Sequence, residues 1–491
     1  MLQSDALTAF LNAAETEKRV AVYQEMSADR LTLVGIAENL AEELQDGAVL
    51  ESGLQHANEG RYSFILFDAM ATITAQKQVV TVCTRDKTVT EATHPFTVVR
   101  RLLAEFSCAP QKQHVDFMHG AVGFITYDAI RLFETIPDQH TPSHLPEMMF
   151  KFYQTTVMLD HLQQTITLST MVEVQGDAAQ AYRQAQLYLS RLQAKIKRTN
   201  QEKKSVRAFV SHENTLEDVD VDDSDFMDKV MSAKDAIVKG DAFQIVLSRC
   251  FKRRYTVDPF EVYRALRRVS PAPYMFYFPT DYGVIIGASP EKFVSLQEGK
   301  VEMHPIAGTR QRTPQTDDAQ KAQELLNDGK ECAEHMMLVD LARNDLGRVC
   351  EPGTVVVDKL LQVKHFSHVS HLASVVRGQL SQDKDAFDVL AAAFPAGTVS
   401  GAPKIRAMQL IDDLETSKRG LYGGALCRLD YQGNLDSCLA IRTAMLQDGT
   451  AVVRAGAGVV FDSNPAAEAA ETRQKACGIL AALALAEEGL S

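Results

Sequence analysis

Strand-like segments in this chain follow one another in runs, and this order constrains the fold more than any other feature. Clustered or alternating β-branched and aromatic residues predict strands within four stretches, 61–83, 148–170, 242–310 and 419–461. Apolar residues at helical spacing predict helices at 177–198, 225–241, 319–345 and 464–480. Because a doubly wound parallel sheet needs strands and helices that alternate, this order predicts an α+β fold, with large, mostly antiparallel β-sheets packed against outer helices.

The chain of 491 residues is longer than one ordinary hydrophobic core organises, so we expect two regions. A polar and charged segment at 199–225 has no helical apolar stripe and is interpreted as a linker with room for an edge strand. It separates a smaller N-terminal α+β region, residues 1–198, from a larger region, residues 226–491.

The formal net charge of −13 argues against some classes of partner. Such a surface repels nucleic acid and anionic membranes, so neither is expected to bind, and a site for a small anion must supply its own positive charge. The eight cysteines include no C-x-x-C pair, which predicts reduced core thiols in a cytoplasmic protein. No signal peptide is apparent, and no apolar run reaches the roughly 18–20 residues that cross a bilayer.

Two predicted helices each carry a pair of carboxylates on one face. In the last helix, Glu468, Glu471 and Lys475 are spaced three and then four residues apart, which places them on one face of a largely apolar helix. In an earlier helix, Glu331 and Glu334 have the same spacing. Either pair alone is more often solvated surface, whereas two such helices together can supply an all-oxygen Mg²⁺ site.

Cations and small residues near the C-terminus suggest a site for an anion. Arg442, in the predicted strand 436–449, and Lys475 lie in apolar sequence, where they either neutralise a neighbouring carboxylate or bind carboxylates of a ligand. Gly456 and Gly458 in "RAGAGVV" allow either close approach of a ligand to the backbone or tight strand packing. Together these features favour a small polyanion held by Mg²⁺, arginine, lysine and backbone amides.

Ten stretches of the sequence resemble the chorismate-utilising enzymes, and most of all the large subunits (component I) of anthranilate synthases. Between residues 226 and 480 they occur in the order of the family: "GDAFQIVLSR", "SPAPYMFYF", "GASPEKFV", "HPIAGTR", "EHMMLVDLARNDLGRV", "HVSHLAS", "FPAGTVSGAPK", "RGLYGGA", "LAIRTA" and "RAGAGVVFDSNPAAEAAETRQKA". In the N-terminal region "VLESG" and "GRYSFI" fit as well. The resemblance implies the chorismate-binding enzyme fold, with a catalytic domain at 226–491 and a regulatory site contributed by residues 1–198.

The resemblance also implies roles for individual residues. Glu334 and Glu471 would be the principal Mg²⁺ ligands, with Glu331 and Glu468 nearby in direct or water-mediated contact. The metal would hold one carboxylate of chorismate. The residues that would bind the remainder of this dianion and line its site are Tyr422, Arg442, Lys475, Ala307, Gly308, Thr309 and the amides near Gly456 and Gly458.

Glu291, in "GASPEKF", would be the general acid in the family's reaction. Hydroxide is a poor leaving group at C4 of chorismate, so a carboxylic acid must protonate it, which requires a pKa raised by burial or by neighbouring negative charge. His371, in "HVSHLAS", would assist the later removal of a ring proton, the alternative being a structural histidine bonded to a backbone group. Thr398, in "PAGTVSG", would line the catalytic pocket.

Two positions distinguish the possible products. Isochorismate and salicylate synthases carry a lysine that activates water at the position of Gln244, and glutamine cannot take up a proton at any working pH. Aminodeoxychorismate synthases typically carry a nucleophilic lysine where this chain has Ala307. Gln244 and Ala307 therefore point to direct amination of C2 by ammonia. Pyruvate elimination would then give anthranilate, a lyase reaction that is the first committed step of tryptophan biosynthesis.

The resemblance further implies a protein partner and an effector. A separate glutamine amidotransferase small subunit would supply ammonia, in a heterotetramer of two large and two small subunits. L-Tryptophan would be a feedback inhibitor bound away from the Mg²⁺ site. The residues matching its site are Glu51, Ser52, Pro273, Tyr274 and Met275. Arg428 departs from the family here, because relatives often carry tyrosine at this position.

Several alternatives to anthranilate formation remain at this stage. Sibling enzymes make aminodeoxychorismate or isochorismate, and a related enzyme stops at 2-amino-2-deoxyisochorismate without eliminating pyruvate. A non-catalytic homologue would instead sense amino acids as a regulatory subunit. The mass of the product formed from chorismate distinguishes these alternatives.

Overall fold

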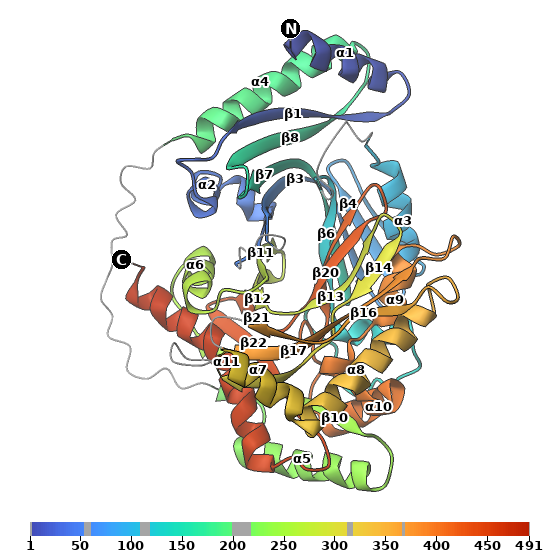
Figure 1. Ribbon diagram of the computed structural model, residues 1–491. Helices are drawn as coiled ribbons and strands as arrows, with labels where there is room; N and C mark the ends of the chain where they lie inside the picture. The colour runs from blue at the N-terminus through green and yellow to red at the C-terminus, as the bar shows by residue number, and fades with distance from the viewer. Residues whose placement is uncertain are drawn as a thin grey trace.

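The computed structural model describes residues 2–53, 60–108, 118–198, 218–311, 318–365 and 369–490. Its strands join in one sheet of 22 strands, and within these ranges every pairing between named strands is antiparallel (Figure 1). The predicted α+β class with mostly antiparallel sheet is therefore confirmed. Antiparallel neighbours can be joined by short turns, which is why the sequence shows strands in runs.

In the first part of the chain, α1 and α4 pack over the strand pair β1 and β8, at the top of Figure 1. The strands are β1 (Arg19–Ser27), β2 (Ala48–Glu51), β3 (Tyr62–Gln76), β4 (Val79–Thr84), β5 (Thr88–Ala92), β6 (Gly120–Ile125), β7 (Met148–Asp160) and β8 (Thr165–Glu173). The helices are α1 (Leu2–Ala14), α2 (Leu33–Asn39), α3 (Pro95–Glu105) and α4 (Ala178–Ile196), with 3₁₀ turns at Glu43–Asp46 and Tyr127–Leu132.

The second part contributes the remaining strands, which carry most of the predicted site. They are β9 (Asp218–Val219), β10 (Gln244–Arg254), β11 (Tyr274–Thr280), β12 (Gly283–Ser289), β13 (Lys292–Gln297), β14 (Lys300–Met303), β15 (Ile306–Gln311), β16 (Val356–His365), β17 (Val369–Gln379), β18 (Gly401–Ala402), β19 (Ala425–Asp430), β20 (Leu435–Leu439), β21 (Thr443–Gln447) and β22 (Thr450–Val459). The helices are α5 (Asp223–Val238), α6 (Pro259–Val269), α7 (Asp318–Asn327), α8 (Gly329–Gly347), α9 (Ala386–Ala393), α10 (Lys404–Leu414) and α11 (Pro465–Glu488), with a 3₁₀ turn at Gly397–Val399.

Strands of the two parts pair with each other. β2 pairs with β11, and β6 pairs with β19 along its whole length, from Gly120 opposite Asp430 to Ile125 opposite Ala425. The predicted regions 1–198 and 226–491 thus share one hydrogen-bonded sheet. Their division into separate domains stays a prediction.

Three predicted boundaries need correction. Helix α5 begins at Asp223 rather than 225, because the carboxylate of Asp222 accepts a hydrogen bond from the backbone N–H of Asp225 and caps the helix. The preceding β9 pairs with β10, as the expected edge strand. The segment 319–345 divides into α7 and α8 at the N-cap Asp328, and the predicted strand 436–449 breaks between β20 and β21.

Two large apolar cores anchor the helices that carry the predicted site. On one side, α8 and α9 bury Val339, Leu346 and Phe387 against Phe293 of β13. On the other side, α6 and α11 pack into a second core, the members of which include Tyr263, Leu266, Phe251, Val453, Ile479 and Leu483. Burying one such side chain contributes about 1.5–3 kcal/mol to the free energy of unfolding. Helices α8 and α11, which carry the predicted site, are therefore fixed to the sheet by packing rather than by their polar faces.

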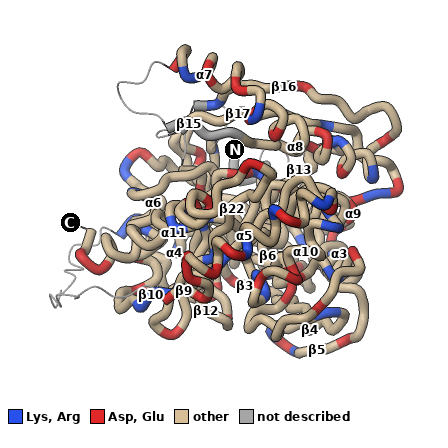
Figure 2. The backbone as a smooth tube through the Cα atoms, turned by 90° about the horizontal axis from the view of Figure 1, so that it is seen from below, with Lys and Arg blue, Asp and Glu red and all other residues tan. Residues whose placement is uncertain are grey.

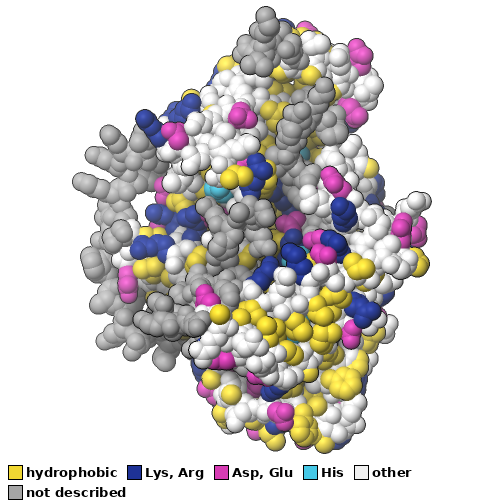
Figure 3. Space-filling model, viewed as in Figure 1, with side chains coloured by type: hydrophobic (Ala, Val, Ile, Leu, Met, Phe, Trp, Pro, Cys, Tyr) yellow, Lys and Arg dark blue, Asp and Glu magenta, His cyan; other side chains and the backbone are white. Residues whose placement is uncertain are grey.

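Charged residues of both signs are distributed along the described part of the chain. Basic and acidic residues alternate along the chain in Figure 2, without a basic stripe in that view. Hydrophobic side chains gather over the lower half of the face in Figure 3. The exposed large hydrophobic residues include Met336 of α8 and Ile405 of α10, at 36% and 46% exposure. Within the described ranges, no helix is long and apolar enough to cross a membrane. Within the described ranges none of the eight cysteines forms a disulfide, and Cys83 and Cys477 are exposed rather than in the core.

Candidate active site

Gln244 opens strand β10 and points toward helix α8. Its Nε2 donates a hydrogen bond to Oε1 of Glu334 at 3.1 Å. Its side chain is 5% exposed, and no described residue donates a hydrogen bond to the buried Oε1. A Cβ atom at Gly458 would lie 3.0 Å from Nε2, so any larger residue there would press on the amide. The glycine therefore leaves room for Gln244, and the amide keeps one acceptor available.

Gly456 leaves comparable room for Tyr422. A Cβ atom at Gly456 would lie 2.3 Å from the Tyr422 hydroxyl oxygen, closer than atoms can approach. Burial raises the pKa of Tyr422 to about 12, so the phenol stays protonated near neutral pH. At both glycines the structure thus shows tight packing, one of the two alternatives. Contact of their amides with a ligand stays a prediction.

The two acidic helices contact β10 and β22 through their polar faces: Glu334 of α8 accepts from Gln244 of β10, and Lys475 of α11 donates to Gly456 of β22. All five side chains of these faces, Glu331, Glu334, Glu468, Glu471 and Lys475, are half-buried rather than fully solvated. The ammonium of Lys475 lies 2.6 Å from Oε1 of Glu471 and donates to the carbonyl oxygen of Gly456 at 3.0 Å. Lys475 therefore joins α11 to β22 and neutralises one carboxylate.

The charges of these faces fit a divalent cation. Burial raises the pKa of Glu334, and the neighbouring Glu331 and Glu471 raise it further. Burial likewise raises the pKa of Glu468, again with a contribution from Glu471. Within the described ranges, no three His, Cys, Asp or Glu side chains lie close enough to chelate one metal ion. Mg²⁺ typically takes only one or two carboxylates besides water and substrate oxygens, so the donor set is compatible with it.

Arg442 lies in a break of the sheet and not inside a strand, which corrects the sequence-based prediction. Its φ angle of 50° is left-handed, and its carbonyl oxygen accepts a hydrogen bond from the N–H of Ala288 at 3.1 Å. The break ends β20 and starts β21. Burial lowers the pKa of Arg442, and the negative charge of Glu471 raises it in part. The guanidinium thus lies within the field of the acidic face of α11.

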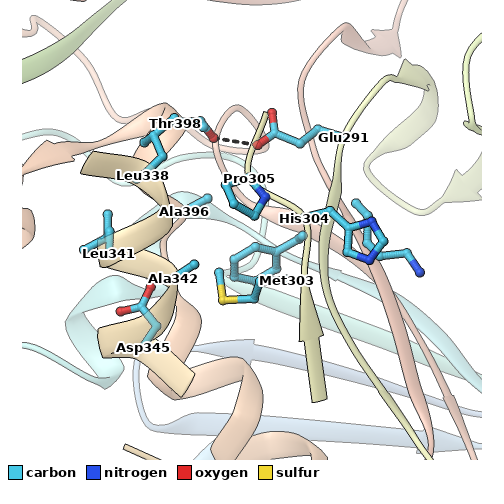
Figure 4. A pocket seen from close by; sticks show the side chains of 13 residues that line it. Glu291, Met303, His304, Pro305, Leu338, Leu341, Ala342, Asp345, Ala396 and Thr398 are labelled. Atoms are coloured by element: carbon cyan, nitrogen blue, oxygen red, sulfur yellow. Dashed lines mark hydrogen bonds between the residues drawn. The ribbon is translucent and has the colours of Figure 1, made fainter. Parts of the chain in front are cut away.

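Glu291 lies between β12 and β13, beside a pocket that Figure 4 shows. Leu338, Leu341 and Ala342 of α8 line one side of this pocket, and Met303 and Pro305 line the other.

Burial raises the pKa of Glu291 to about 7, against the smaller opposing effects of a hydrogen bond and of Lys475. That bond comes from the Thr398 hydroxyl, which donates to Oε1 at 2.9 Å. A large share of Glu291 is therefore protonated at neutral pH, as its predicted role requires.

His371 and the residues around Ala307 lie on adjacent strands. His371 is half-buried in β17, opposite Lys364 of β16. Ala307 lies in β15 opposite Leu372 of β17, so it is one position away from His371 across the ladder. Gly308 and Thr309 continue β15, and their side chains lie outside the described part of the structure.

A family model described as chorismate binding enzyme matches residues 49–481. The chain belongs to the chorismate-binding enzymes. This match covers both the acidic helices and the strands β10 and β22.

Relatives of the chain within this family are similar over nearly their full length. It is 40% identical to anthranilate synthase component 1 of Bacillus caldotenax, covering 99% of this chain and 98% of the relative. It is 36% identical to that of Aquifex aeolicus, with 97% of each chain covered. The crystal structure of anthranilate synthase component I from Streptococcus pneumoniae superposes with a TM-score of 0.71 at 34% identity, covering 87% and 93%. The resemblance to anthranilate synthase large subunits is therefore confirmed.

Isochorismate synthases share the fold more distantly. The menaquinone-specific isochorismate synthase of Escherichia coli superposes with a TM-score of 0.68, covering 98% of this chain and 100% of that chain. At 19% identity this likeness shows the fold alone.

Sequence reasoning missed a buried charge cluster that supports the site of this chorismate-binding enzyme. The Glu415 carboxylate accepts hydrogen bonds from the N–H and hydroxyl of Ser248 at 2.7 and 2.8 Å. It also accepts from Arg419, at 2.6 and 2.9 Å, and from Arg454, at 3.1 Å. These partners lower the pKa of Glu415 although burial opposes them. The spacing of Glu415 and Arg419 was the available signal, but it suits an exposed helix pair equally well.

His335 is a second buried residue that the sequence analysis passed over. It follows Glu334 on α8 and is fully buried, with Nε2 2.6 Å from the Ser374 hydroxyl oxygen. Burial lowers its pKa to about 4, so it is neutral at pH 7. The same hydroxyl accepts from the N–H of Leu361, whose φ of 52° is left-handed. His335 thus holds β16 and β17 against α8.

The residues predicted to bind an effector meet where β2 pairs with β11. Glu51 lies opposite Met275 in that ladder. Both carboxylate oxygens of Glu51 accept hydrogen bonds from Arg267 at 2.6 Å, and Tyr263 donates to Oε2 at 3.1 Å.

The other residues of the predicted effector site lie around this ladder. Pro273 and Ser52 flank the paired segments. The Tyr274 hydroxyl donates to Asp436 at 3.1 Å, and the Arg428 guanidinium lies 3.5 Å above the centre of the Phe64 ring.

We predict that Glu415→Gln destabilises the fold by about 3–5 kcal/mol, because it leaves the buried Arg419 guanidinium without a counter-charge and Arg454 with Asp220 alone. The measurement is urea unfolding at pH 7, with the exposed Glu488→Gln as matched control. Since the pKa of Glu415 is lowered in the folded state, its contribution is complete above the pKa of an unfolded glutamate. The difference from wild type should therefore shrink as the pH falls through the folded pKa. Equal stability of the two variants at pH 7 would contradict the role assigned to Glu415.

Proposed function

We propose that this chain is the large subunit of an anthranilate synthase, which aminates chorismate at C2 with ammonia and then eliminates pyruvate to give anthranilate. Two relatives at 36% and 40% identity are anthranilate synthase component 1 proteins, and the similarity covers nearly the whole of each chain. The structural observation that best supports ammonia as nucleophile is the amide of Gln244, with its Oε1 buried and accepting no hydrogen bond from a described residue.

Gln244 suits ammonia better than water. Water must lose a proton as it attacks, and an amide cannot accept one. Ammonia is already nucleophilic when neutral and needs only to be oriented. An acceptor fixed in a buried position, with Nε2 tied to Glu334, would receive one N–H of ammonia and direct its lone pair toward the ring.

Glu291 is the proposed acid for departure of the C4 hydroxyl. As the C2–N bond forms, the ring double bond shifts and the C4–O bond breaks, and the proton of Glu291 leaves with the oxygen as water. Thr398 donates to Oε1, which leaves the other oxygen to carry the proton. His371 is proposed to assist the removal of the ring proton at C2 that accompanies loss of pyruvate, which makes the ring aromatic.

The substrate dianion is proposed to lie between cations and the acidic helices. Arg442 and Lys475 would pair with its carboxylates, and the Tyr422 hydroxyl and the strand β22 would complete the site. Glu334 and Glu471 are the proposed principal holders of Mg²⁺, with Glu331 and Glu468 beside them. Bound there, Mg²⁺ would neutralise a substrate carboxylate next to the position that ammonia attacks.

We also propose the partner and the effector that the family resemblance implies. The name component 1 fits an assembly with a second component, for which we propose a glutamine amidotransferase small subunit in a heterotetramer. L-Tryptophan is proposed to inhibit by binding near Glu51, Ser52, Pro273, Tyr274 and Met275. There the Arg428 guanidinium already covers one face of Phe64, which would weaken binding of an aromatic effector. A cytoplasmic location stays a prediction.

The first test of this function is the product formed from chorismate. With Mg²⁺ and ammonium, the wild-type chain should form anthranilate, followed by its fluorescence and its mass, and adding glutamine with the small subunit should replace the need for ammonium. Gln244→Lys should reduce amination about 100-fold or more and yield detectable isochorismate, because lysine can activate water. Gln323→Lys, on α7, is the control. Isochorismate as the main product of the wild-type chain would refute the proposal.

The second test concerns the proton on Glu291. Because the acid must be protonated, kcat/KM should fall as pH rises through about 7, when free ammonia is held constant. Thr398→Val removes the hydrogen bond that lowers this pKa, so the fall should move to higher pH. Thr165→Val, at the start of β8, should leave the profile unchanged. An unshifted profile in Thr398→Val would contradict the assignment of the acid.

The third test concerns Mg²⁺. Glu334→Gln should raise the Mg²⁺ concentration needed for half-maximal activity by about tenfold or more, because one charged oxygen ligand is lost. Titration of activity after treatment with EDTA measures this concentration, and the exposed Glu25→Gln serves as control. Wild-type activity of Glu334→Gln at low Mg²⁺ would remove Glu334 from the metal site.

A further inference from the structure

Arg419 is a buried arginine that is not among the residues predicted to bind substrate or metal. Its guanidinium nevertheless contacts several segments of the site. It is 5% exposed and precedes the turn that carries Tyr422. Nε and Nη2 donate to the two carboxylate oxygens of Glu415 at 2.9 and 2.6 Å. This bidentate pair fixes the plane of the guanidinium and leaves further N–H groups directed elsewhere.

Those N–H groups hold the backbone next to two residues of the site. Nη1 donates to the carbonyl oxygen of Val399 at 2.6 Å, directly after Thr398. Nη2 donates to the carbonyl oxygen of Val246 at 2.6 Å, two positions after Gln244 and on the same face of β10. The guanidinium therefore sets the spacing between the strand of the ammonia-facing amide and the turn that holds the acid Glu291.

The guanidinium of Arg419 lies over two tyrosine rings. Its carbon lies 5.5 Å from the ring centre of Tyr422, a proposed substrate contact, and 4.5 Å from that of Tyr127. Tyr127 belongs to the N-terminal region. The same region also forms hydrogen bonds with Gly420, the residue that follows Arg419. The Asp128 carboxylate accepts from the N–H of Gly420 at 2.8 Å, and the N–H of Tyr127 donates to the Gly420 carbonyl oxygen at 2.9 Å.

We propose that Arg419 is a positioning residue for the reaction: its one guanidinium sets Thr398, Gln244 and Tyr422 relative to one another, and Tyr127 holds it from the N-terminal region. This inference rests on the proposed function, which supplies the roles of those three residues. Lysine cannot replace it, because a single ammonium cannot bond Glu415, Val399 and Val246 in three fixed directions while stacking on two rings.

Arg454 provides a matched control within the same cluster. It is also buried and also donates to Glu415, at 3.1 Å. Its other side-chain partners in the described part of the structure are Ser248, Asp220 and Ser417, none of which is a predicted site residue. Replacing either arginine by lysine keeps the charge and disturbs the same carboxylate. Only the Arg419 variant releases the backbone beside Thr398 and Gln244.

The experiment compares Arg419→Lys with Arg454→Lys in the full chain, using chorismate, Mg²⁺ and a fixed concentration of free ammonia. We expect kcat of Arg419→Lys to fall about 10- to 100-fold, as displacements near 1 Å do in active sites, while kcat of Arg454→Lys changes less than about threefold. The pH at which kcat/KM falls should rise in Arg419→Lys only, because the Thr398 bond that lowers the pKa of Glu291 is loosened. Urea unfolding reports the stability of both variants.

Equal losses of kcat in the two variants, or an unshifted pH profile in Arg419→Lys, would overturn the inference and leave Arg419 a structural residue. If Arg419→Lys does not fold, Tyr127→Leu takes its place: it removes one stacked ring and should lower kcat with the same upward shift of the pH profile. A normal profile in Tyr127→Leu would then overturn the inference. If the wild-type chain forms another product, the proposed function is refuted instead. The kcat values and pH profiles of the two variants are then measured from formation of that product.

Discussion

The site depends on a charge that water cannot reach. The Glu415 carboxylate is 6% exposed, and a lone carboxylate in such surroundings would be protonated or would unfold its environment. Arg419, Arg454 and Ser248 keep it ionised. They come from the turn after α10, from β22 and from β10, so these three elements must assemble together or not at all. The elements that present Gln244, Gly456 and Tyr422 are therefore fixed by an electrostatic requirement, beyond the packing of their apolar faces.

On the proposed ligand-binding side, cations balance the half-buried carboxylates less completely. Around α8 and α11, carboxylates outnumber cations. Burial makes Glu334 and Glu468 harder to ionise by raising their pKa, and the acidic neighbours raise it further. These carboxylates repel one another, and a bound cation would relieve the repulsion. Bringing in a divalent cation together with a dicarboxylate would remove the repulsion and pair Arg442 and Lys475 at once. Binding of metal and of substrate should thus each favour the other.

Much of the fold and of the site follows from the sequence, because local patterns report local structure. Predicted strands that follow one another along the chain indicated an antiparallel sheet. The spacing of three and four residues placed Glu468, Glu471 and Lys475 on one helix face. The break before α8 was also present in the sequence, as Asp328 followed three residues later by Glu331 is an N-terminal helix signal. It was passed over because the apolar pattern runs on through it.

What the sequence did not reveal depends on contacts between distant segments. Nothing marks Arg442 as the residue that turns left-handed between β20 and β21, since arginine rarely adopts such a φ. The burial of Glu415 beside Arg419 likewise depends on strands from elsewhere in the chain, because the same pair on an isolated helix would be exposed. The burial of His335 depends in the same way on β17, which brings Ser374 beside it. These residues carry long-range information that periodicity does not contain.

The pairing of β6 with β19 affects how the protein is made. Residues 120–125 emerge from the ribosome long before residues 425–430, their neighbours in the sheet. Until then β6 (Gly120–Ile125), every residue of which is buried in the folded protein, has one edge unpaired in the nascent chain. Unpaired strand edges of this kind recruit other extended chains. We expect translation of this protein to pass through a prolonged aggregation-prone stage in which chaperones shield that edge until the last fifth of the polypeptide closes it.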